Sequence, residues 1–324
     1  MLYTNSQKSQ IFNKPIFIEE NIPLADKNTF GTGGNARFFA QPTTAQEFAQ
    51  ALQFAQTHNL KTFILGGGAN ILISDDGFDG LVIRPALHNV TITDIDQTSV
   101  LVKAGAGISI EYLIAHCLDH QIIGLEEFSG IPGTVGGAVY INLHYYEFLL
   151  EHFLVSATLI HAKTHEIITV DKQWFQFGYD QSKLQEKEYF VIDATFKLTQ
   201  VDALTTAFAR GRSVEITRHR QKRYPYQNTC GSFFRNFHPH EVAQTDKKLI
   251  YVAYYLDQLG VKGQLSVGGA IISHQHANMI VCNNGTSTDI LDLTMMMQKM
   301  MYEAYGIKPQ PECQLVGFDN HPFE

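Results

Sequence analysis

The chain has few cysteines and only one tryptophan. Its 324 residues contain four cysteines, Cys117, Cys230, Cys282 and Cys313, which lie far apart and form no Cys-x-x-Cys pair. This spacing predicts neither a zinc site nor a disulfide framework. We expect reduced thiols with a structural role.

Long apolar runs and a positive net charge are absent as well. No apolar run approaches the roughly 20 residues of a membrane-spanning helix, and residues 1–10 are polar, without the apolar core of a signal peptide. The formal net charge is -8, whereas a general nucleic-acid-binding protein uses many Lys and Arg contacts to phosphates. We therefore expect a cytoplasmic protein that binds neither a membrane nor a nucleic acid.

What remains is the composition of a globular protein. The apolar content is 44% and the mean hydropathy is -0.10, and the length suits two or three domains of ordinary size. Charge is dense in residues 218–223, and Pro225 breaks the helix that precedes it. We predict units at residues 1–85, 86–218 and 219–324, with the main boundary at this break.

Capping residues and hydrophobic periodicity predict most of the secondary structure. Helices are expected after Thr44 with Glu47, after Ser109, after Thr286 with Asp289, and at 203–220 and 247–259; strands are expected at 90–105, 155–161, 167–170, 190–198 and 267–272.

A glycine-rich turn at 66–70 separates short apolar runs at 61–65, 71–74 and 80–83. This order is strand, turn, strand, so it does not match a dinucleotide-binding Rossmann motif, which carries Gly-x-Gly-x-x-Gly directly before a helix. The three glycines 66–68 still allow positive φ angles, and their N–H groups could converge on a phosphate. A tight hairpin between buried strands is the other interpretation.

A second glycine loop, Gly130–Ala138, has glycines on both sides of Pro132 and a hydroxyl at Thr134. It lacks the Lys-Ser/Thr ending of a Walker A loop. Two separate glycine loops suit one extended dinucleotide that is held from both sides.

One hydroxyl lies between a flexible glycine and two aromatic rings, in the run Gly231-Ser232-Phe233-Phe234. In a desolvated pocket such a serine can donate a proton to a developing carbanion, although a serine in a loop is usually an ordinary turn residue. Glu312 lies in a rigid segment between Pro311 and the end of the chain. By itself it would be a surface carboxylate.

The basic run 218–223 is the dense positive cluster of this acidic chain. It is either the solvated end of a helix or a phosphate-binding edge, for which Arg223 and Lys222 have the best reach. His274 and His276 have a spacing that suits a metal, but no third ligand of suitable type stands nearby, so we expect no metal site.

Six motifs occur in an order that resembles the UDP-N-acetylenolpyruvoylglucosamine reductase (UDP-N-acetylmuramate dehydrogenase) family. The resemblance covers about Leu24 to Gly317, and although each motif alone is weak, the six in this order are specific. The motifs are Asn28-Thr29-Phe30, Gly33-Gly34-x-Ala36-Arg37, Gly66-Gly67-Gly68-Ala69-Asn70, Gly130–Ala138, Gly231-Ser232-Phe233-Phe234-Arg235-Asn236 and His276-Ala277-Asn278.

The resemblance implies an α+β protein with an FAD-binding domain of the vanillyl-alcohol-oxidase (PCMH) type in two subdomains, 1–85 and 86–218, followed by a smaller α+β substrate-binding domain. It implies non-covalent FAD, NADPH as reductant and a small UDP-sugar substrate. In this family UDP-N-acetylglucosamine enolpyruvate is reduced to UDP-N-acetylmuramate for peptidoglycan, and thus for the cell wall, cell shape and cell division. We expect a monomer.

The same resemblance assigns roles to residues. Ser232 is the implied proton donor, and Glu312 assists at the charge that develops on the substrate, which needs electrostatic stabilisation. Arg223, Asn236, His276 and Asn278 are the implied substrate-binding residues. The implied FAD-binding residues are Gly66, Gly67, Gly68, Ala69, Asn70, Ile71, Ser129, Gly130, Pro132, Gly133, Thr134, Gly136 and Gly137.

One departure from the family is serious. The family carries Tyr-Arg-x-Ser, with the arginine facing the substrate carboxylate, where this chain has Tyr179-Asp180-Gln181-Ser182. A buried acid would repel an enolate by several kcal/mol. The segment Asn142–Glu147 and Ala69 also differ from the family, and the short stretch between Asp180 and Ser232 resembles the branch without a substrate-capping tyrosine loop.

Three interpretations follow from this departure. In the first, the chain is a working reductase in which Lys183, Arg235 or Arg37 replaces the arginine. In the second, it is a flavin-binding paralogue with lost or altered activity. A third, an alcohol or sugar oxidase of the same fold, is less well supported, because nothing resembles the histidine or cysteine flavin attachment of some of those enzymes.

Overall fold

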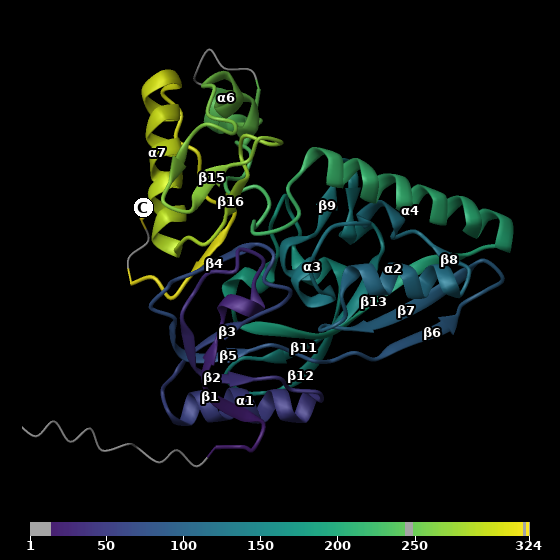
Figure 1. The fold of residues 1–324 in the computed structure, drawn as a ribbon. Helices are drawn as coiled ribbons and strands as arrows, with labels where there is room; N and C mark the ends of the chain where they lie inside the picture. Colours follow the sequence, from purple (N-terminus) through teal and green to yellow (C-terminus); the bar gives the residue numbers. More distant parts are fainter. Residues whose placement is uncertain (1–13, 244–248, 320–321, 324) are drawn as a thin grey trace, which may run out of the picture.

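The computed structural model describes residues 14–243, 249–319 and 322–323. Figure 1 shows a broad body built on two sheets, with a smaller lobe beside it that carries the C-terminal third of the chain. The body contains the elements from β1 to α4, and the lobe contains those from α5 to α7.

The first sheet is formed by the N-terminal strands, in the order β1-β2-β5-β3. β1 and β2 are antiparallel, whereas β2, β5 and β3 run parallel. Helix α1 lies along this sheet (Figure 1), and Phe48 and Leu52 on its inner face pack on Phe38 of β2. The bounds are β1 Ile18–Pro23, β2 Asn35–Ala40, α1 Ala45–Thr57, β3 Lys61–Ile64 and β5 Phe78–Ile83.

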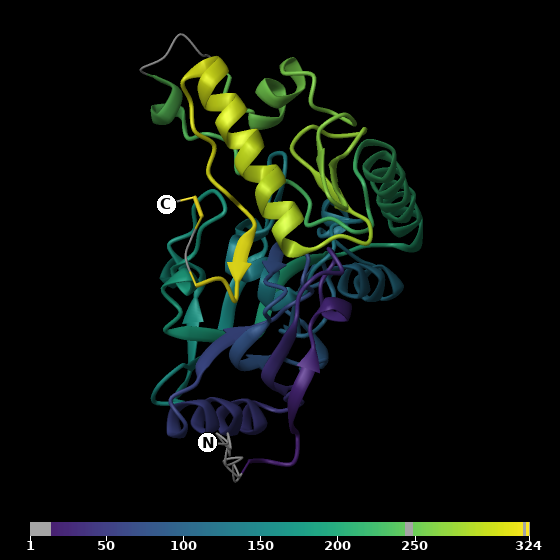
Figure 2. The ribbon, with the colours of Figure 1, turned by 60° about the vertical axis from the view of Figure 1, so that its left-hand side comes forward.

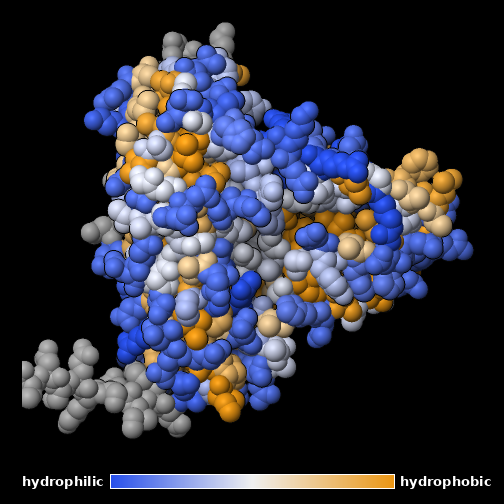
Figure 3. Space-filling view, in the orientation of Figure 1, coloured by the Kyte–Doolittle hydropathy of each residue, from blue (hydrophilic) through white to orange (hydrophobic). Residues whose placement is uncertain are grey.

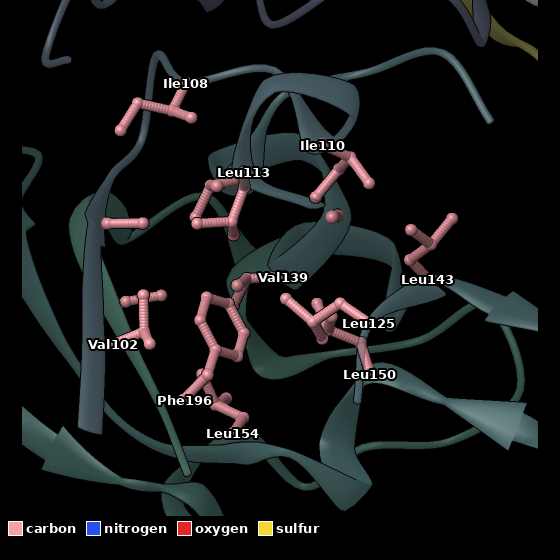
Figure 4. Close-up of a cluster of buried hydrophobic side chains, with 14 of the residues drawn as sticks. Val102, Ile108, Ile110, Leu113, Leu125, Val139, Leu143, Leu150, Leu154 and Phe196 are labelled. Atoms are coloured by element: carbon pink, nitrogen blue, oxygen red, sulfur yellow. The ribbon is translucent and has the colours of Figure 1, made fainter. Parts of the chain in front are cut away.

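The second sheet is antiparallel, with the order β12-β11-β13-β7-β6 and β8 paired to β13. Helices α2 and α3 cover one face, and Figure 4 shows Leu113 and Val139 from these helices above Val102 and Phe196 of the sheet. The bounds are β6 Val90–Asp94, β7 Ser99–Gly105, α2 Ile110–Asp119, β8 Ile122–Ile123, α3 Val135–Ile141, β9 His144–Tyr145, β10 Phe148–Leu149, β11 Leu154–His161, β12 Ile167–Asp171, β13 Tyr189–Gln200 and α4 Ala203–Arg223.

The lobe packs α6 and α7 on a small antiparallel sheet, β14-β15-β16. Met297 and Met301 of α7 are fully buried in its core, so the methionine-rich face of this helix contributes to packing. The bounds are α5 Pro239–Ala243, α6 Val252–Gln258, β14 Ser266–Val267, β15 Ala270–Ile272, β16 Ile280–Cys282, α7 Ser287–Tyr305, and short 3-10 helices at Ala25–Lys27, Glu126–Phe128, Leu150–His152, Lys172–Phe175 and Lys183–Glu186.

Two sequence predictions in the lobe need correction. The helix expected at 247–259 begins only at Val252, because the backbone N–H of Phe237 pairs with the Ile250 carbonyl and holds that residue outside the helix; residues 247–248 lie outside the described part. The strand expected at 267–272 is a hairpin, because Gly268 has φ +51° and forms with Gly269 a two-residue turn between β14 and β15. The caps at Thr44, Ser109 and Thr286 are confirmed.

The chain returns from the lobe to the body at two places. Strand β17, Gln314–Val316, pairs in parallel with β4, Ile71–Ile73. The first turn of α7 also reaches the body, as Figure 2 shows. The Asp75 carboxylate accepts hydrogen bonds from the Ser287 N–H at 2.7 Å and from its hydroxyl at 2.8 Å, and the Asp75 N–H donates to the Ser287 hydroxyl at 2.9 Å. These contacts fix the position of the lobe relative to the body.

Asp75→Ala should therefore lower the free energy of unfolding by about 1–3 kcal/mol, because it leaves the donors of the buried Ser287 without their acceptor. Urea unfolding measures the change. Asp76→Ala is the matched control, since it removes a neighbouring exposed carboxylate and should change the value by less than about 0.5 kcal/mol. Equal stabilities for the two variants would contradict a structural role for the Asp75–Ser287 contact.

Candidate functional site

A cleft of about 1600 Å³ lies where the body, helix α4 and the lobe meet. Figure 3 shows a hollow with apolar walls beneath α4 and a polar rim. Its volume exceeds that of a typical pocket for one small molecule, so it has room for a cofactor and a substrate together. The cleft is lined by Ala69, Asn70 and 129–132 of the two glycine loops, by α4 residues including Arg220 and Arg223, by 143–147, by Tyr179 and Asp180, by 229–232 and 236–239, by His276 and Asn278, and by Glu312.

The two glycine loops, which are far apart in the sequence, pack directly on each other. A Cβ atom on Gly66 would lie 2.9 Å from the Thr134 hydroxyl, and one on Gly67 would lie 2.9 Å from the Gly133 Cα. Gly68 has φ +67°, a conformation that favours glycine. Glycine is thus required here so that the two backbones can approach closely.

The predicted cofactor residues divide into two groups. Ala69, Asn70, Ser129, Gly130 and Pro132 line the cleft. The other eight, Gly66, Gly67, Gly68, Ile71, Gly133, Thr134, Gly136 and Gly137, do not form its wall but shape the loops behind it.

One buried polar atom in the first glycine loop lacks a hydrogen-bond partner among the described residues. Within the described residues, Asn70 Oδ1 is buried and makes no hydrogen bond. A buried acceptor without a partner costs free energy unless a ligand or water supplies a donor. Together with the glycine surfaces that admit no side chain, Asn70 fits a bound dinucleotide at this end of the cleft.

The segment of Ser232 is held on both sides. Ser232 pairs with Met279 as an isolated β-bridge, and the next residue, Phe233, donates its N–H to the Asn278 carbonyl at 2.8 Å. The buried Asn278 side chain accepts from the Phe234 N–H at 3.1 Å and donates to the Phe234 carbonyl at 2.7 Å. Asn278 therefore orients the strand that carries Ser232.

The same segment places Glu312 close to Ser232. The Phe233 carbonyl accepts the N–H of Glu312 at 2.8 Å, so the two predicted catalytic residues lie on adjacent extended segments at the cleft wall. Burial, followed by the charge of Asp180, raises the pKa of Glu312 to about 8. At pH 7 this carboxyl is mostly protonated and can donate a hydrogen bond.

Asp180 does face the cleft. It adopts φ +54° in the tight turn between Gly178 and Gln181, and its Oδ1 lies 3.3 Å from Nδ1 of His144. Burial raises the pKa of Asp180, while His144 and Arg235 oppose that shift. His144 was not among the predicted site residues; its only signal in the sequence was its place in the segment 142–147, which departs from the family.

The three cations considered as substitutes for the family arginine lie outside the cleft wall. The Lys183 ammonium lies 5.0 Å from the centre of the Trp174 ring. Arg37 forms an ion pair with Asp79 on the first sheet. The Arg235 guanidinium is bound by both oxygens of Glu241, at 2.7 and 2.8 Å.

The basic run contributes Arg220 and Arg223 to the wall, whereas Lys222 is exposed outside it. Arg223 donates to the Tyr146 hydroxyl at 2.8 Å. Arg220 donates to the Gly130 carbonyl at 3.2 Å, and its guanidinium stacks near Tyr145. Arg220 thus links helix α4 to the second glycine loop, a role that its place on the last turns of a helix did not reveal.

His276 and Asn236 line the lobe side of the cleft. Burial, followed by the charge of Arg223, lowers the pKa of His276 to about 4, so this side chain is neutral at pH 7. The Asn236 amide donates to the Tyr179 hydroxyl at 3.2 Å, and its carbonyl oxygen accepts from the Val252 N–H at 3.3 Å. Both residues therefore present neutral polar groups.

Within residues 14–243, 249–319 and 322–323, no three His, Cys, Asp or Glu side chains converge as a metal site requires. Over the same residues, no helix has both the length and the apolar character that crossing a bilayer takes.

Two family models match the chain. An FAD-binding domain matches residues 36–170, and the C-terminal domain of UDP-N-acetylenolpyruvoylglucosamine reductase matches residues 222–316. The first match identifies the body as an FAD-binding domain, in agreement with the packed glycine loops.

Full-length relatives show the same relationship. The chain is 33% identical to the UDP-N-acetylenolpyruvoylglucosamine reductase of Prochlorococcus marinus, over 94% of this chain and 99% of that protein. It is 30% identical to reductase 2 of Bacillus anthracis, over 93% of each. The crystal structure of the reductase from Thermus caldophilus matches with a TM-score of 0.73 and 25% identity, over 92% of this chain and 98% of the other.

These matches confirm the fold expected from the sequence: an α+β protein with an FAD-binding domain of the vanillyl-alcohol-oxidase type, followed by a smaller α+β domain. The sequence identity extends over nearly the whole length of this chain and of each relative, so it covers both the body and the lobe. The chain therefore belongs to the UDP-N-acetylenolpyruvoylglucosamine reductase family.

Proposed function

We propose that this protein reduces UDP-N-acetylglucosamine enolpyruvate to UDP-N-acetylmuramate, a step in peptidoglycan precursor synthesis, with NADPH as reductant and non-covalently bound FAD. The observation that carries the proposal is the adjacency of Ser232 and Glu312 in a cleft that also reaches both glycine loops. Asn70 and the glycine loops at 66–70 and 130–138 would hold FAD, which would supply the hydride-transfer chemistry between NADPH and the substrate.

The protein's own residues donate the proton and stabilise the negative charge that develops on the substrate. Hydride addition at the terminal carbon of the enolpyruvyl group leaves negative charge on the adjacent carbon and its carboxylate. Ser232 donates its hydroxyl proton to that carbon and is reprotonated from solvent. Glu312, protonated at pH 7, donates a hydrogen bond to the charge that develops on the carboxylate.

The remaining cleft residues hold the sugar nucleotide. Arg223 and Arg220 supply positive charge for the diphosphate, and Asn236 and neutral His276 offer uncharged polar contacts. Asn278 acts on the substrate indirectly, since its side chain is engaged with Phe234.

A second candidate function rests on Asp180. This carboxyl lies in the cleft wall, where it would repel an anionic substrate. A flavin-binding paralogue with lost or altered reductase activity is therefore the alternative.

Three further expectations stay predictions. They are the division into units at 1–85, 86–218 and 219–324, across which β17 returns to β4, the monomeric state, and the cytoplasmic location.

Three measurements test the proposal. Purified protein should show a flavin absorption spectrum, or acquire one with added FAD. NADPH oxidation should then be slow alone and faster with the enolpyruvyl sugar nucleotide, and chromatography should show UDP-N-acetylmuramate as product. Steady-state NADPH oxidation whose rate does not depend on the sugar nucleotide would refute the reductase and favour the paralogue. Protein that takes up no FAD would refute both.

A further inference from the structure

The cleft wall that carries the two residues of the proposed proton transfer also contains a close contact between a histidine and a carboxyl group. His144, from β9, and Asp180, from the turn after Phe177, approach to 3.3 Å, and their side chains are only 24% and 13% exposed. Both line the same cleft as Ser232 and Glu312. The proposed reaction as described above uses no contact of His144.

The local fold fixes the pair in place. Asn142, 1% exposed and with φ +51°, donates from its side chain to the Gly178 carbonyl at 3.2 Å. Its Oδ1 accepts from the Glu151 N–H at 3.2 Å. Asn142 thus ties the turn of Asp180 to the β9–β10 hairpin of His144, and the Tyr179 ring packs at 4.6 Å on the imidazole.

Only one nitrogen of His144 is occupied. Nδ1 faces Asp180, and among the residues that the structure describes none forms a hydrogen bond with Nε2. A carboxylate beside one ring nitrogen orients an imidazole. The ring is therefore held in place, with Nε2 left without a partner among the described residues, in a cleft whose proposed substrate carries a carboxylate.

We propose that His144, held by Asp180, is the cation that binds the carboxylate of the enolpyruvyl group in this protein. The inference rests on the proposed function and names the residue that serves its anionic substrate. Asp180 then is a positioning residue: in the ion pair its charge is matched by His144, so the repulsion that an isolated acid would exert on the substrate is removed.

The other cations considered near the pair form contacts with other groups. Arg235 is bound by both oxygens of Glu241, whose pKa is lowered to about 2, chiefly by that hydrogen bond. Arg223 and Arg220 belong to the α4 side of the cleft, with the tyrosines of the hairpin. The charged and titratable groups that act on Asp180 or on the adjacent Tyr179 are Arg235, His238, Tyr251 and Glu312.

His144→Gln keeps a polar side chain but removes the charge. We expect kcat/KM for the enolpyruvyl sugar nucleotide to fall about 10²-fold, the size expected for loss of one charge-stabilising donor, with flavin reduction by NADPH unchanged. Calorimetry on the FAD-loaded proteins at pH 6, where Glu312 keeps its proton, should show weaker binding of the sugar nucleotide to the variant than to the wild type.

Two further variants separate the charge from the shape of the side chain. His144→Arg should recover much of the activity and of the sugar-nucleotide binding, because it places a permanent positive charge at this position. Asp180→Asn should raise KM for the sugar nucleotide, because it removes the carboxylate that orients the imidazole. His274→Gln, at an exposed histidine outside the cleft wall, is the control and should match the wild type.

A His144→Gln variant with wild-type kcat/KM and wild-type affinity for the sugar nucleotide would overturn the inference while the reductase remained. A failure of His144→Arg to recover activity would overturn it also, if that variant folds and takes up FAD. Wild-type protein without any turnover of the enolpyruvyl sugar nucleotide would overturn the proposed function, and this inference with it.

Discussion

Ser232→Ala is expected to lower the rate of enolpyruvyl reduction by about 10²–10⁴-fold, the contribution typical of a positioned general acid. Ser232 lies at the cleft wall on a strand that is bridged to Met279 on one side and, through Phe233, to Glu312 on the other. Alanine fits this backbone, so the change should remove the proton donor without moving the strand.

The two half-reactions distinguish this role from a structural one. Stopped-flow absorbance should show flavin reduction by NADPH at the wild-type rate and reoxidation by the sugar nucleotide at the reduced rate. Ser273→Ala is a suitable control, because Ser273 is 3% exposed and hydrogen-bonded to the Gln275 N–H but lies outside this cleft wall. Loss of both half-reactions in Ser232→Ala, with the control intact, would show that the serine does not act as the proton donor.

Glu312→Gln is expected to remove a dependence of stability and activity on pH. The pKa of Glu312 is raised from 4.5 to about 8 in the folded protein, so the folded state binds more protons than the unfolded state between these values. Stability should thus be highest at the acidic end of this window and fall as the pH rises toward 8, by on the order of a few kcal/mol. The variant has no such carboxyl and should lose this component.

Urea unfolding from pH 5 to pH 9 measures the difference, with Glu303→Gln on the exposed face of α7 as the control. The wild-type turnover should also decline above about pH 8, where Glu312 loses the proton that it donates as a hydrogen bond. A variant whose stability follows the wild-type curve across this range would mean that Glu312 is ionised in the folded protein at pH 7. The proposed donor role would then fail.

Local sequence was sufficient for much of the fold. The caps at Ser109 and Thr286 formed as expected because a capping hydroxyl bonds an N–H only three residues away. The strand-turn-strand order around Gly67 was predicted correctly for a similar reason, since the turn and its neighbours are adjacent in the chain. The helix start at Val252 was not predicted, because it is set by a backbone hydrogen bond from the N–H of Phe237 to the carbonyl of Ile250.

The sequence by itself determined the family, the two glycine loops and the identities of Ser232, Glu312 and Asp180, because motifs in a fixed order carry that information without coordinates. Only the tertiary structure decided how these parts meet. The close contact of Gly67 with Gly133, the approach of Glu312 to the Ser232 strand and the pairing of Asp180 with His144 all join distant segments. Such contacts depend on burial and on hydrogen-bond partners that chain order does not specify, and they place the acid that stands at the family's arginine position beside His144.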